Sequence, residues 1–207
     1  MKYNEDYYER GQELGISGYS NYRWLPGLTV PMCKTIADDL FLDKNSSILD
    51  FGCAKGFLVK AFKDLGYDSY GIDVSEYAIK NCHPDVSDRC KLYTGKSISE
   101  AFDKRFNFVL SKDVFEHIPY EVIDKVLIDI RNHTDRLYTI VPLGTNGKYI
   151  IPSYENDVTH IIREPMDWWV EKIRKAGFHV KTATYQHKGI KDNWSSWEFG
   201  NAFIDAV

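Results

Sequence analysis

The fold of this 207-residue chain can be inferred outward from residues 48–56, Ile48-Leu49-Asp50-Phe51-Gly52-Cys53-Ala54-Lys55-Gly56. Its first four residues are apolar apart from one acid, and such a run predicts a short buried strand. Two glycines follow at positions where the backbone must turn sharply and leave room for a ligand. Apolar residues at 57, 58, 61, 62 and 65 then predict a helix that ends at Gly66. The segment is therefore a strand, a glycine loop and a helix.

The rest of the chain repeats this alternation. Further strands are predicted at residues 70–74, 91–94, 106–110, 137–141, 179–185 and 202–206, and helices at residues 76–81, after Pro119 and after Pro165. Alternating strands and helices of this kind form a parallel sheet covered by helices on both faces. The sequence therefore predicts one three-layer α/β domain.

An aromatic-rich segment precedes this domain. Six aromatic residues lie among three glycines without a regular period: Tyr3, Tyr7, Tyr8, Tyr19, Tyr22 and Trp24. Apolar positions from Cys33 to Phe41 then predict an amphipathic helix with Pro31 in its first turn. We therefore divide the chain into residues 1–46, an N-terminal segment and helix, and residues 47–207, the main domain. The aromatic segment either folds over a ligand site as a lid or packs elsewhere on the domain.

Composition excludes several classes of protein. Lys and Arg number 26 against 30 Asp and Glu, so the chain lacks the basic excess with which proteins bind nucleic-acid backbones, which disfavours a nucleic-acid partner. No apolar run approaches the roughly 20 residues of a membrane span. The four cysteines form no Cys-x-x-Cys pair and the first residues lack the apolar core of a secretory signal, which predicts a cytoplasmic protein. Cys82-His83 is the only adjacent soft pair, so no metal site is expected.

The ligand site is expected where the strands end, because open α/β sheets bind ligands outside the carboxyl ends of their strands. Asp50 stands at the end of the first strand and Asp73 at the end of the second, at a spacing that suits a carboxylate bound to ribose hydroxyls. A dinucleotide fingerprint that starts at Gly52 requires a glycine at position 57, which is Phe57. This disfavours a nicotinamide-dependent oxidoreductase and favours an adenosine ligand without phosphates.

Three motifs together resemble those of class I S-adenosylmethionine-dependent methyltransferases. Residues 48–56 are similar to motif I of that family, and Gly71-Ile72-Asp73-Val74-Ser75 to the acidic strand that follows it. Residues 106–118 look like the fourth strand with its common Glu116-His117-Ile118 ending. Ala54 departs from the pattern, because the family usually has a glycine there. The resemblance covers residues 47–145.

The resemblance implies a Rossmann-like three-layer sandwich with a mostly parallel seven-stranded sheet and an antiparallel last strand. It also implies S-adenosylmethionine as the cofactor. In the family's arrangement Asp73 accepts both ribose hydroxyls, while Asp50 and the backbone around Gly52 and Gly56 receive the methionine amino group. The implied cofactor-binding set is Asp50, Gly52, Cys53, Ala54, Gly56, Asp73, Val74, Ser111 and Asp113. The alternative is that the two acids merely cap turns or helices.

Two histidines are the candidate catalytic residues. Methyl transfer from a sulfonium is an in-line displacement, so a base is needed only for a protonated acceptor, and a neutral imidazole can serve near pH 7. His117 follows the fourth strand, and His160 lies in the long connection 143–163, which we assign to acceptor binding. The alternatives are a His117 that shapes the pocket wall and a His160 that is an ordinary polar loop residue.

We therefore predict an enzyme that moves a methyl group from S-adenosylmethionine to a small polar acceptor, an oxygen of a sugar or similar metabolite. The Asn/Asp-Pro-Pro-aromatic motif of DNA amino-methylating enzymes is not found after the fifth strand, where Val141-Pro142-Leu143-Gly144 stands instead. Two alternatives stay open: methylation of a protein or nucleic acid, and a non-catalytic S-adenosylmethionine-binding protein. No membrane partner is expected.

Overall fold

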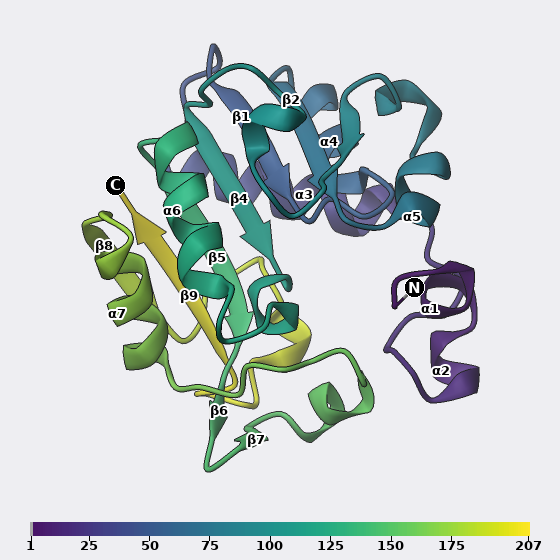
Figure 1. Cartoon of the computed structure of the whole chain (residues 1–207), viewed down its shortest axis with the longest axis vertical. Helices are drawn as coiled ribbons and strands as arrows, with labels where there is room; N and C mark the ends of the chain where they lie inside the picture. The colour runs from purple at the N-terminus through teal and green to yellow at the C-terminus, as the bar shows by residue number, and fades with distance from the viewer. Residues whose placement is uncertain (1) are drawn as a thin grey trace.

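A seven-stranded sheet forms the centre of the computed structural model, which describes residues 2–207. The strand order is β3-β2-β1-β4-β5-β9-β8, and β9 alone runs in the direction opposite to the other six strands (Figure 1). The strands are β1 (Ser47–Phe51), β2 (Asp68–Asp73), β3 (Cys90–Leu92), β4 (Phe108–Lys112), β5 (Leu137–Pro142), β8 (Val180–Thr184) and β9 (Asn201–Ala206). The predicted fold class is confirmed.

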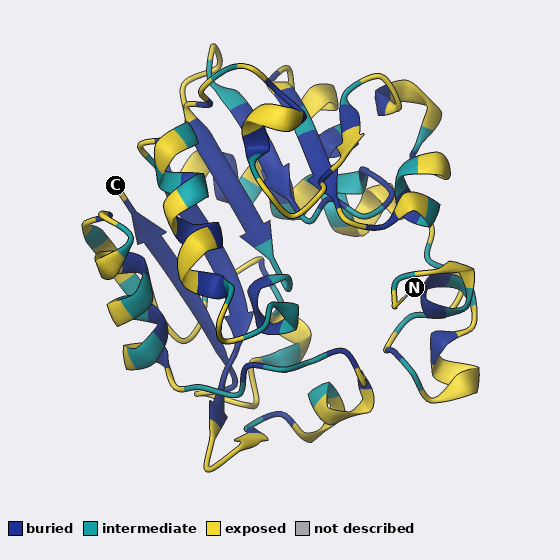
Figure 2. Cartoon of the chain, in the orientation of Figure 1, coloured by how far each residue is buried: buried dark blue, intermediate teal, exposed yellow. Residues whose placement is uncertain are grey.

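Helices cover both faces of this sheet. One face packs against α3 (Pro26–Asp39) and α4 (Phe57–Asp64), and the other against α6 (Ile123–His133) and α7 (Met166–Lys175). The strands are buried throughout most of the sheet while the outer faces of the helices are exposed (Figure 2). Trp169 of α7 is fully buried in the core, as its helical spacing predicts. The result is three layers with the sheet in the middle.

The register of β1 determines where the ligand site lies. Ile48 and Leu49 are fully buried, because β1 is a central strand with helices on both sides. β1 is parallel to β2 and β4, and its residue Phe51 pairs with Ile72. The loop after β1 therefore emerges beside Asp73, which follows Ile72 at the end of β2. Two acids that are separate in the sequence come to the same edge of the sheet.

The helix before the core begins earlier than predicted. α3 starts at Pro26, and Pro31 lies inside the helix rather than in its first turn. Pro26 supplies the fixed φ that favours a helix start. Pro31 lacks an N–H, so the carbonyl four residues before it, that of Gly27, loses its helical bond. Gly27 is exposed, and water can satisfy that carbonyl.

The N-terminal segment is more regular than its sequence indicates. It contains two short helices, α1 (Glu5–Glu9) and α2 (Gly11–Leu14), which lie beyond the carboxyl ends of the strands (Figure 1). Asn4 caps α1 by accepting a hydrogen bond from the N–H of Tyr7. Helices this short are marginal by themselves, so α1 is held by the packing of its Tyr7 and Tyr8 against other tyrosines of the segment and against α5 (Glu76–Lys80).

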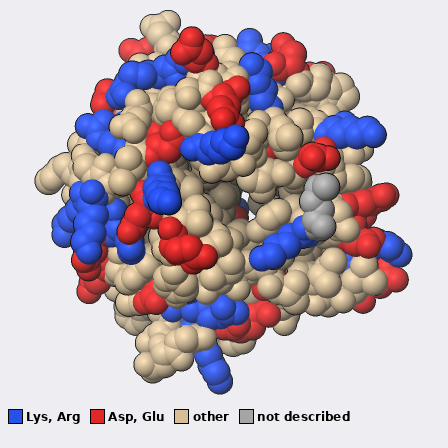
Figure 3. Space-filling view, viewed as in Figure 1, with Lys and Arg blue, Asp and Glu red and all other residues tan. Residues whose placement is uncertain are grey.

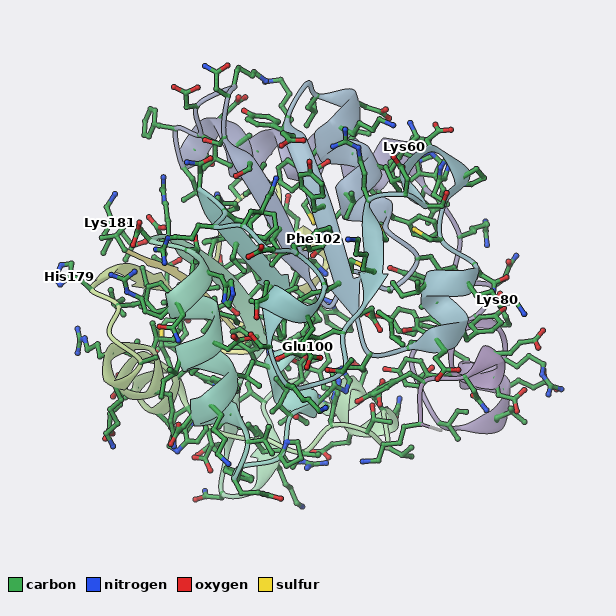
Figure 4. All side chains as sticks on the ribbon, turned by 45° about the horizontal axis from the view of Figure 1, so that its top comes forward. Lys60, Lys80, Glu100, Phe102, His179 and Lys181 are labelled. Atoms are coloured by element: carbon green, nitrogen blue, oxygen red, sulfur yellow. The ribbon has the colours of Figure 1, made fainter. Side chains whose placement is uncertain are left out.

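Short elements fill the remaining connections. The connection after β5 forms a small hairpin of β6 (Gly144–Thr145) and β7 (Lys148–Tyr149). The 3₁₀ turns are η1 (Pro84–Val86), η2 (Ile98–Glu100), η3 (Phe115–His117), η4 (Pro152–Asn156) and η5 (Asp192–Trp194). In Figure 4, His179 and Lys181 lie on one side of the molecule, and Lys60 and Lys80 lie on the other side. Within residues 2–207, every helix is too short or too polar to cross a membrane.

Candidate functional site

A cavity of about 350 Å³ lies at the carboxyl ends of the central strands. Six of the residues predicted for the site line it: Gly52, Ala54, Asp73, Val74, Asp113 and His117. The opposite wall comes from the N-terminal segment, which contributes Tyr3, Tyr7, Tyr8 and Tyr19. Figure 3 shows a hollow in this face of the molecule, with positive and negative side chains interspersed around it. The cavity therefore lies between the glycine loop, the end of β4 and the N-terminal helices.

Gly52 lets the backbone pass close to the cavity. Its φ is +86°, and a Cβ at this position would lie 2.4 Å from a methyl carbon of Val114. Ala54, at the position where the related loops carry glycine, also has a positive φ of 47°. A non-glycine residue with a left-handed backbone stores strain, of order 1 kcal/mol, and such strain occurs at ligand sites. The backbone is therefore left-handed at both Gly52 and Ala54, a conformation that favours glycine.

Asp73 is held by backbone donors on both of its carboxylate oxygens. Its Oδ2 accepts a hydrogen bond from the N–H of Ala54 at 2.8 Å, and its Oδ1 accepts one from the N–H of Ser75 at 2.7 Å. Burial raises the pKa of this carboxyl, and the backbone bonds oppose that rise. Each carboxylate oxygen can accept more than one hydrogen bond, so Asp73 caps the turns and still has acceptor capacity toward the cavity.

Asp50 lies close to the glycine loop but is absent from the cavity wall, as far as residues 2–207 show. Its Oδ2 is buried and finds no hydrogen-bond partner within the same part of the chain. Burial, followed by the nearby charge of Asp73, raises the pKa of Asp50 to about 8, while Lys112 opposes the rise. An uncompensated carboxyl group therefore lies beneath the loop.

Four other predicted residues lie behind the cavity wall. Cys53 packs in a small apolar cluster with Cys82 and Cys90, and a Cβ on Gly56 would lie 2.6 Å from the sulfur of Cys82. Ser111 is fully buried in β4. These residues support the loop and the strand from behind. The fourth, His160, lies behind His117.

Asp113 lies in a cluster of oppositely charged side chains that the sequence does not predict. It has a φ of +55°, and its carboxylate binds the ammonium groups of Lys112 and Lys191. Burial alone would raise the pKa of Asp113, but the two lysines hold it well below its usual range. Lys191 also donates to the Tyr154 hydroxyl at 2.8 Å and to Oδ1 of Asn201 at 2.9 Å. No local motif marks Lys191, because it reaches the site from the connection between β8 and β9.

The hydrogen bonds of His117 define which ring nitrogen carries the proton. Its Nδ1 lies 2.8 Å from Oγ1 of Thr159, and that hydroxyl donates its only proton to Asp157 at 2.5 Å. Nδ1 of His117 must therefore be the donor, so its Nε2 carries a free lone pair. Burial, followed by the nearby His160, lowers the pKa of His117 to about 4. The imidazole is neutral at pH 7.

His160 is oriented in the same manner. Its Nδ1 donates to the backbone carbonyl of Tyr154 at 2.7 Å, so its Nε2 also carries a lone pair. The ring centroids of His117 and His160 lie 4.6 Å apart. Nε2 of His160 lies 3.9 Å from a carboxylate oxygen of Glu116. Burial lowers the pKa of His160, and burial followed by Asp113 raises that of Glu116 well above its usual range. Within residues 2–207, neither carboxylate oxygen of Glu116 has a hydrogen-bond partner.

The N-terminal segment is bonded to both sides of the cavity. Lys55 of the glycine loop pairs with Glu9 and donates to the carbonyl of Tyr22 at 2.9 Å. On the other side, the hydroxyl of Tyr7 donates to Asp157 at 2.8 Å. Four tyrosines of this segment line the cavity, and the segment connects its two sides.

Comparison with known proteins identifies similar domains. A family model described as a methyltransferase domain matches residues 29–185. No curated protein sequence is similar enough to be matched to the chain. Solved structures share its fold: a chain from the complex between the Haloferax volcanii Trm112 methyltransferase activator and a putative methyltransferase has a TM-score of 0.69 at 17% identity, covering 88% of this chain and 91% of that one.

Two further structures are similar over most of their length. A SAM-dependent methyltransferase from Archaeoglobus fulgidus has a TM-score of 0.66 at 16% identity and covers 85% of this chain and 92% of its own. The glycopeptide N-methyltransferase MtfA in complex with S-adenosyl-L-methionine has a TM-score of 0.58 at 15% identity, with 86% and 93% covered. At these identities the structural likeness shows the fold.

Proposed function

The chain belongs to the class I S-adenosylmethionine-dependent methyltransferases, and we propose that it transfers a methyl group from this cofactor to an oxygen of a small polar acceptor such as a sugar. The observation that carries the donor half of the proposal is the position of Asp73. This carboxylate is fixed by two backbone N–H groups at the end of β2 and lines the cavity beside Gly52. A ribose diol offers two hydroxyl donors to such an acceptor.

The donor would occupy the cavity from the β2 end toward the β4 end. Val74 and Tyr93 line the wall next to Asp73 and offer apolar surface to an adenine, while Gly52 and Asp113 line the region for the amino acid tail. The tail's ammonium group would lie near the buried carboxyl of Asp50 and lower its pKa through their opposite charges. Cys53, Gly56 and Ser111 then support the donor site without forming its wall.

The N-terminal segment would act as a lid over the bound donor. Its bonds to Lys55 and Asp157 hold it across the cavity, and its tyrosines supply the opposite wall. Exclusion of water by a closed segment favours transfer to the acceptor over side reactions. The chemistry needs the segment to open for exchange of donor and product.

His117 is the residue we propose to contact the acceptor. It lines the cavity, and its Nε2 lone pair can accept a hydrogen bond from an acceptor hydroxyl. His160 lies behind it and would orient it. Asp113 and Asp157, the neighbouring acids, are already bonded to lysines and to hydroxyl groups respectively. Contact with the acceptor therefore falls to His117.

Calorimetric titration tests the donor half of the proposal. S-adenosylhomocysteine should bind with one site per chain, whereas NAD and NADP should not bind. Failure of S-adenosylhomocysteine to bind would overturn the proposed function. A screen of hydroxyl-bearing metabolites with methyl-labelled donor then tests the acceptor half. Label that appears only on a protein or nucleic acid would contradict the proposed acceptor class.

A further inference from the structure

We propose that Glu116, His117 and His160 form a binding site for a divalent transition-metal cation at the acceptor end of the cavity. One carboxylate oxygen and one nitrogen from each imidazole lie within 4.8 Å of one another. Two imidazoles and a carboxylate are a common ligand set for metals such as zinc, iron, cobalt and manganese. The site lies outside the donor-binding residues around Asp73.

The hydrogen bonds around the histidines leave one nitrogen of each ring free to bind a metal. Each imidazole donates its Nδ1 proton, His117 to Thr159 and His160 to the carbonyl of Tyr154, so both Nε2 lone pairs are available. Metal-binding histidines nearly always donate their second nitrogen to a neighbouring acceptor, which fixes the ring and its tautomer. The two rings therefore have the second hydrogen bond of metal ligands.

Glu116 supplies the observation that points to a ligand. Its side chain is only 1% exposed, and neither oxygen has a hydrogen-bond partner within residues 2–207. Buried carboxyl groups are normally paired, because an isolated one loses its hydration without compensation. A cation between Glu116 and the two lone pairs would satisfy all three groups at once.

The surrounding charges also favour a cation. Three carboxyl groups lie at this end of the cavity, those of Glu116, Asp113 and Asp157, and the ammonium groups of Lys112 and Lys191 lie among them. Both lysines bind Asp113. The nearby guanidinium of Arg163 is paired with Glu155 instead. Within residues 2–207, the Glu116 carboxyl is therefore left without a lysine or arginine partner, and a bound cation would stabilise its charged form.

The distances require only a small adjustment. Tetrahedral ligands about 2.1 Å from a shared ion lie about 3.4 Å apart, so side chains within 4.8 Å of one another would each move by less than about 1 Å. Glu116 and His117 sit on the 3₁₀ turn η3, and His160 lies on the loop whose residues 161 and 162 donate to the carbonyl of Glu116. That backbone connection holds the two segments together.

Because His117 lines the cavity, a cation bound to its Nε2 would take over this nitrogen's contact with the acceptor, and the cation's open positions would face the acceptor. This role rests on the proposed function, whereas binding of the cation does not. A hydroxyl bound to a cation loses its proton more readily. In the transfer, the oxygen forms a bond to the methyl carbon, the methyl–sulfur bond breaks with its electron pair kept by sulfur, and the hydroxyl proton goes to solvent. An acceptor with a second oxygen beside its hydroxyl would bind best.

Cobalt(II) is the probe for this site. Full-length protein without an affinity tag is stripped with a chelator, dialysed and titrated with Co²⁺ while its visible absorption is recorded. We expect one Co²⁺ per chain and at least tenfold weaker binding in both Glu116→Gln and His160→Gln. Matched controls are Glu155→Gln, a paired carboxylate of the same connection, and His179→Gln at the opposite edge of the sheet; both should bind Co²⁺ as the parent does.

Three results would overturn the proposal: no Co²⁺ bound near one per chain by the unmodified protein, binding that survives Glu116→Gln, or equal losses in the control variants. Folding of each variant is checked by circular dichroism, which does not depend on ligand binding. The outcome is separable from the proposed function. Loss of S-adenosylhomocysteine binding by the parent would refute the donor assignment and leave the Co²⁺ result standing.

Discussion

The two ends of the cavity are built in different ways. The donor end consists of short loops after β1 and β2, and the bonds that shape it run between backbone groups and Asp73. The acceptor end consists of side chains from four separate segments, among them Tyr7, His117, Asp157 and Lys191. A backbone-built site can be recognised from a short motif, whereas a site assembled from distant side chains cannot.

Replacement of His117 should affect only the acceptor end. His117→Gln keeps a polar side chain but removes the imidazole, so turnover on a hydroxyl acceptor should fall by about 100-fold or more. Binding of S-adenosylhomocysteine should change by less than about threefold, since less than 1 kcal/mol is at stake. Steady-state kinetics and calorimetry measure the two quantities. Near-native turnover would show that His117 has no role in the transfer, and His179→Gln is the control.

Replacement of Asp73 should affect the donor end. Asp73→Ala removes hydrogen bonds to the ribose that are worth about 1.5–3 kcal/mol each, so S-adenosylhomocysteine should bind at least tenfold more weakly. Asp68→Ala is the control, because Asp68 begins the same strand but is exposed and paired with Arg89. Unchanged affinity in a folded Asp73→Ala protein would disprove the assignment of the ribose site.

Removal of the N-terminal segment tests whether the two ends share a lid. A chain lacking residues 1–24 should bind S-adenosylhomocysteine about three- to tenfold more weakly, a loss of up to about 1.4 kcal/mol, because the tyrosine wall is gone. The core should stay folded, since α3 begins at Pro26. Circular dichroism checks the fold and calorimetry the affinity. Normal donor affinity in the shortened chain would count against the lid.

The smallest effect is expected from the buried Asp50. Its pKa of about 8 lies above its ordinary value of about 4. Between these two pH values the folded protein therefore keeps a proton that the unfolded chain has already released. Stability should therefore fall as the pH rises through this window. Asp50→Asn lacks this titration. The unfolding free energy of the variant minus that of the parent should therefore increase by at least about 1 kcal/mol from pH 5 to pH 8. Urea unfolding without donor measures this, and parallel pH profiles would contradict it.

Much of the fold follows from local sequence. The apolar run 48–51 is a buried strand, Ser75 caps α5, and Trp169 is a core residue, as their patterns predict. The two exceptions have a physical reason. Pro31 lies inside α3 because a helix can lose one hydrogen bond at an exposed carbonyl, and Tyr7 and Tyr8 lie in the helix α1 because they pack on distant residues. Neither effect is visible in a local pattern.

The sequence by itself determined the α/β fold, the family and the glycine-loop end of the cavity, because strand period, turn residues and helix caps act over a few residues. It also identified His117 and His160 as separate candidates. Only the tertiary structure brought their rings to 4.6 Å, placed them beside the unpartnered Glu116 and carried Lys191 to Asp113. These groupings depend on how long connections close over the sheet. Side-chain pairing between distant segments follows from packing, which no spacing of residues along the chain specifies.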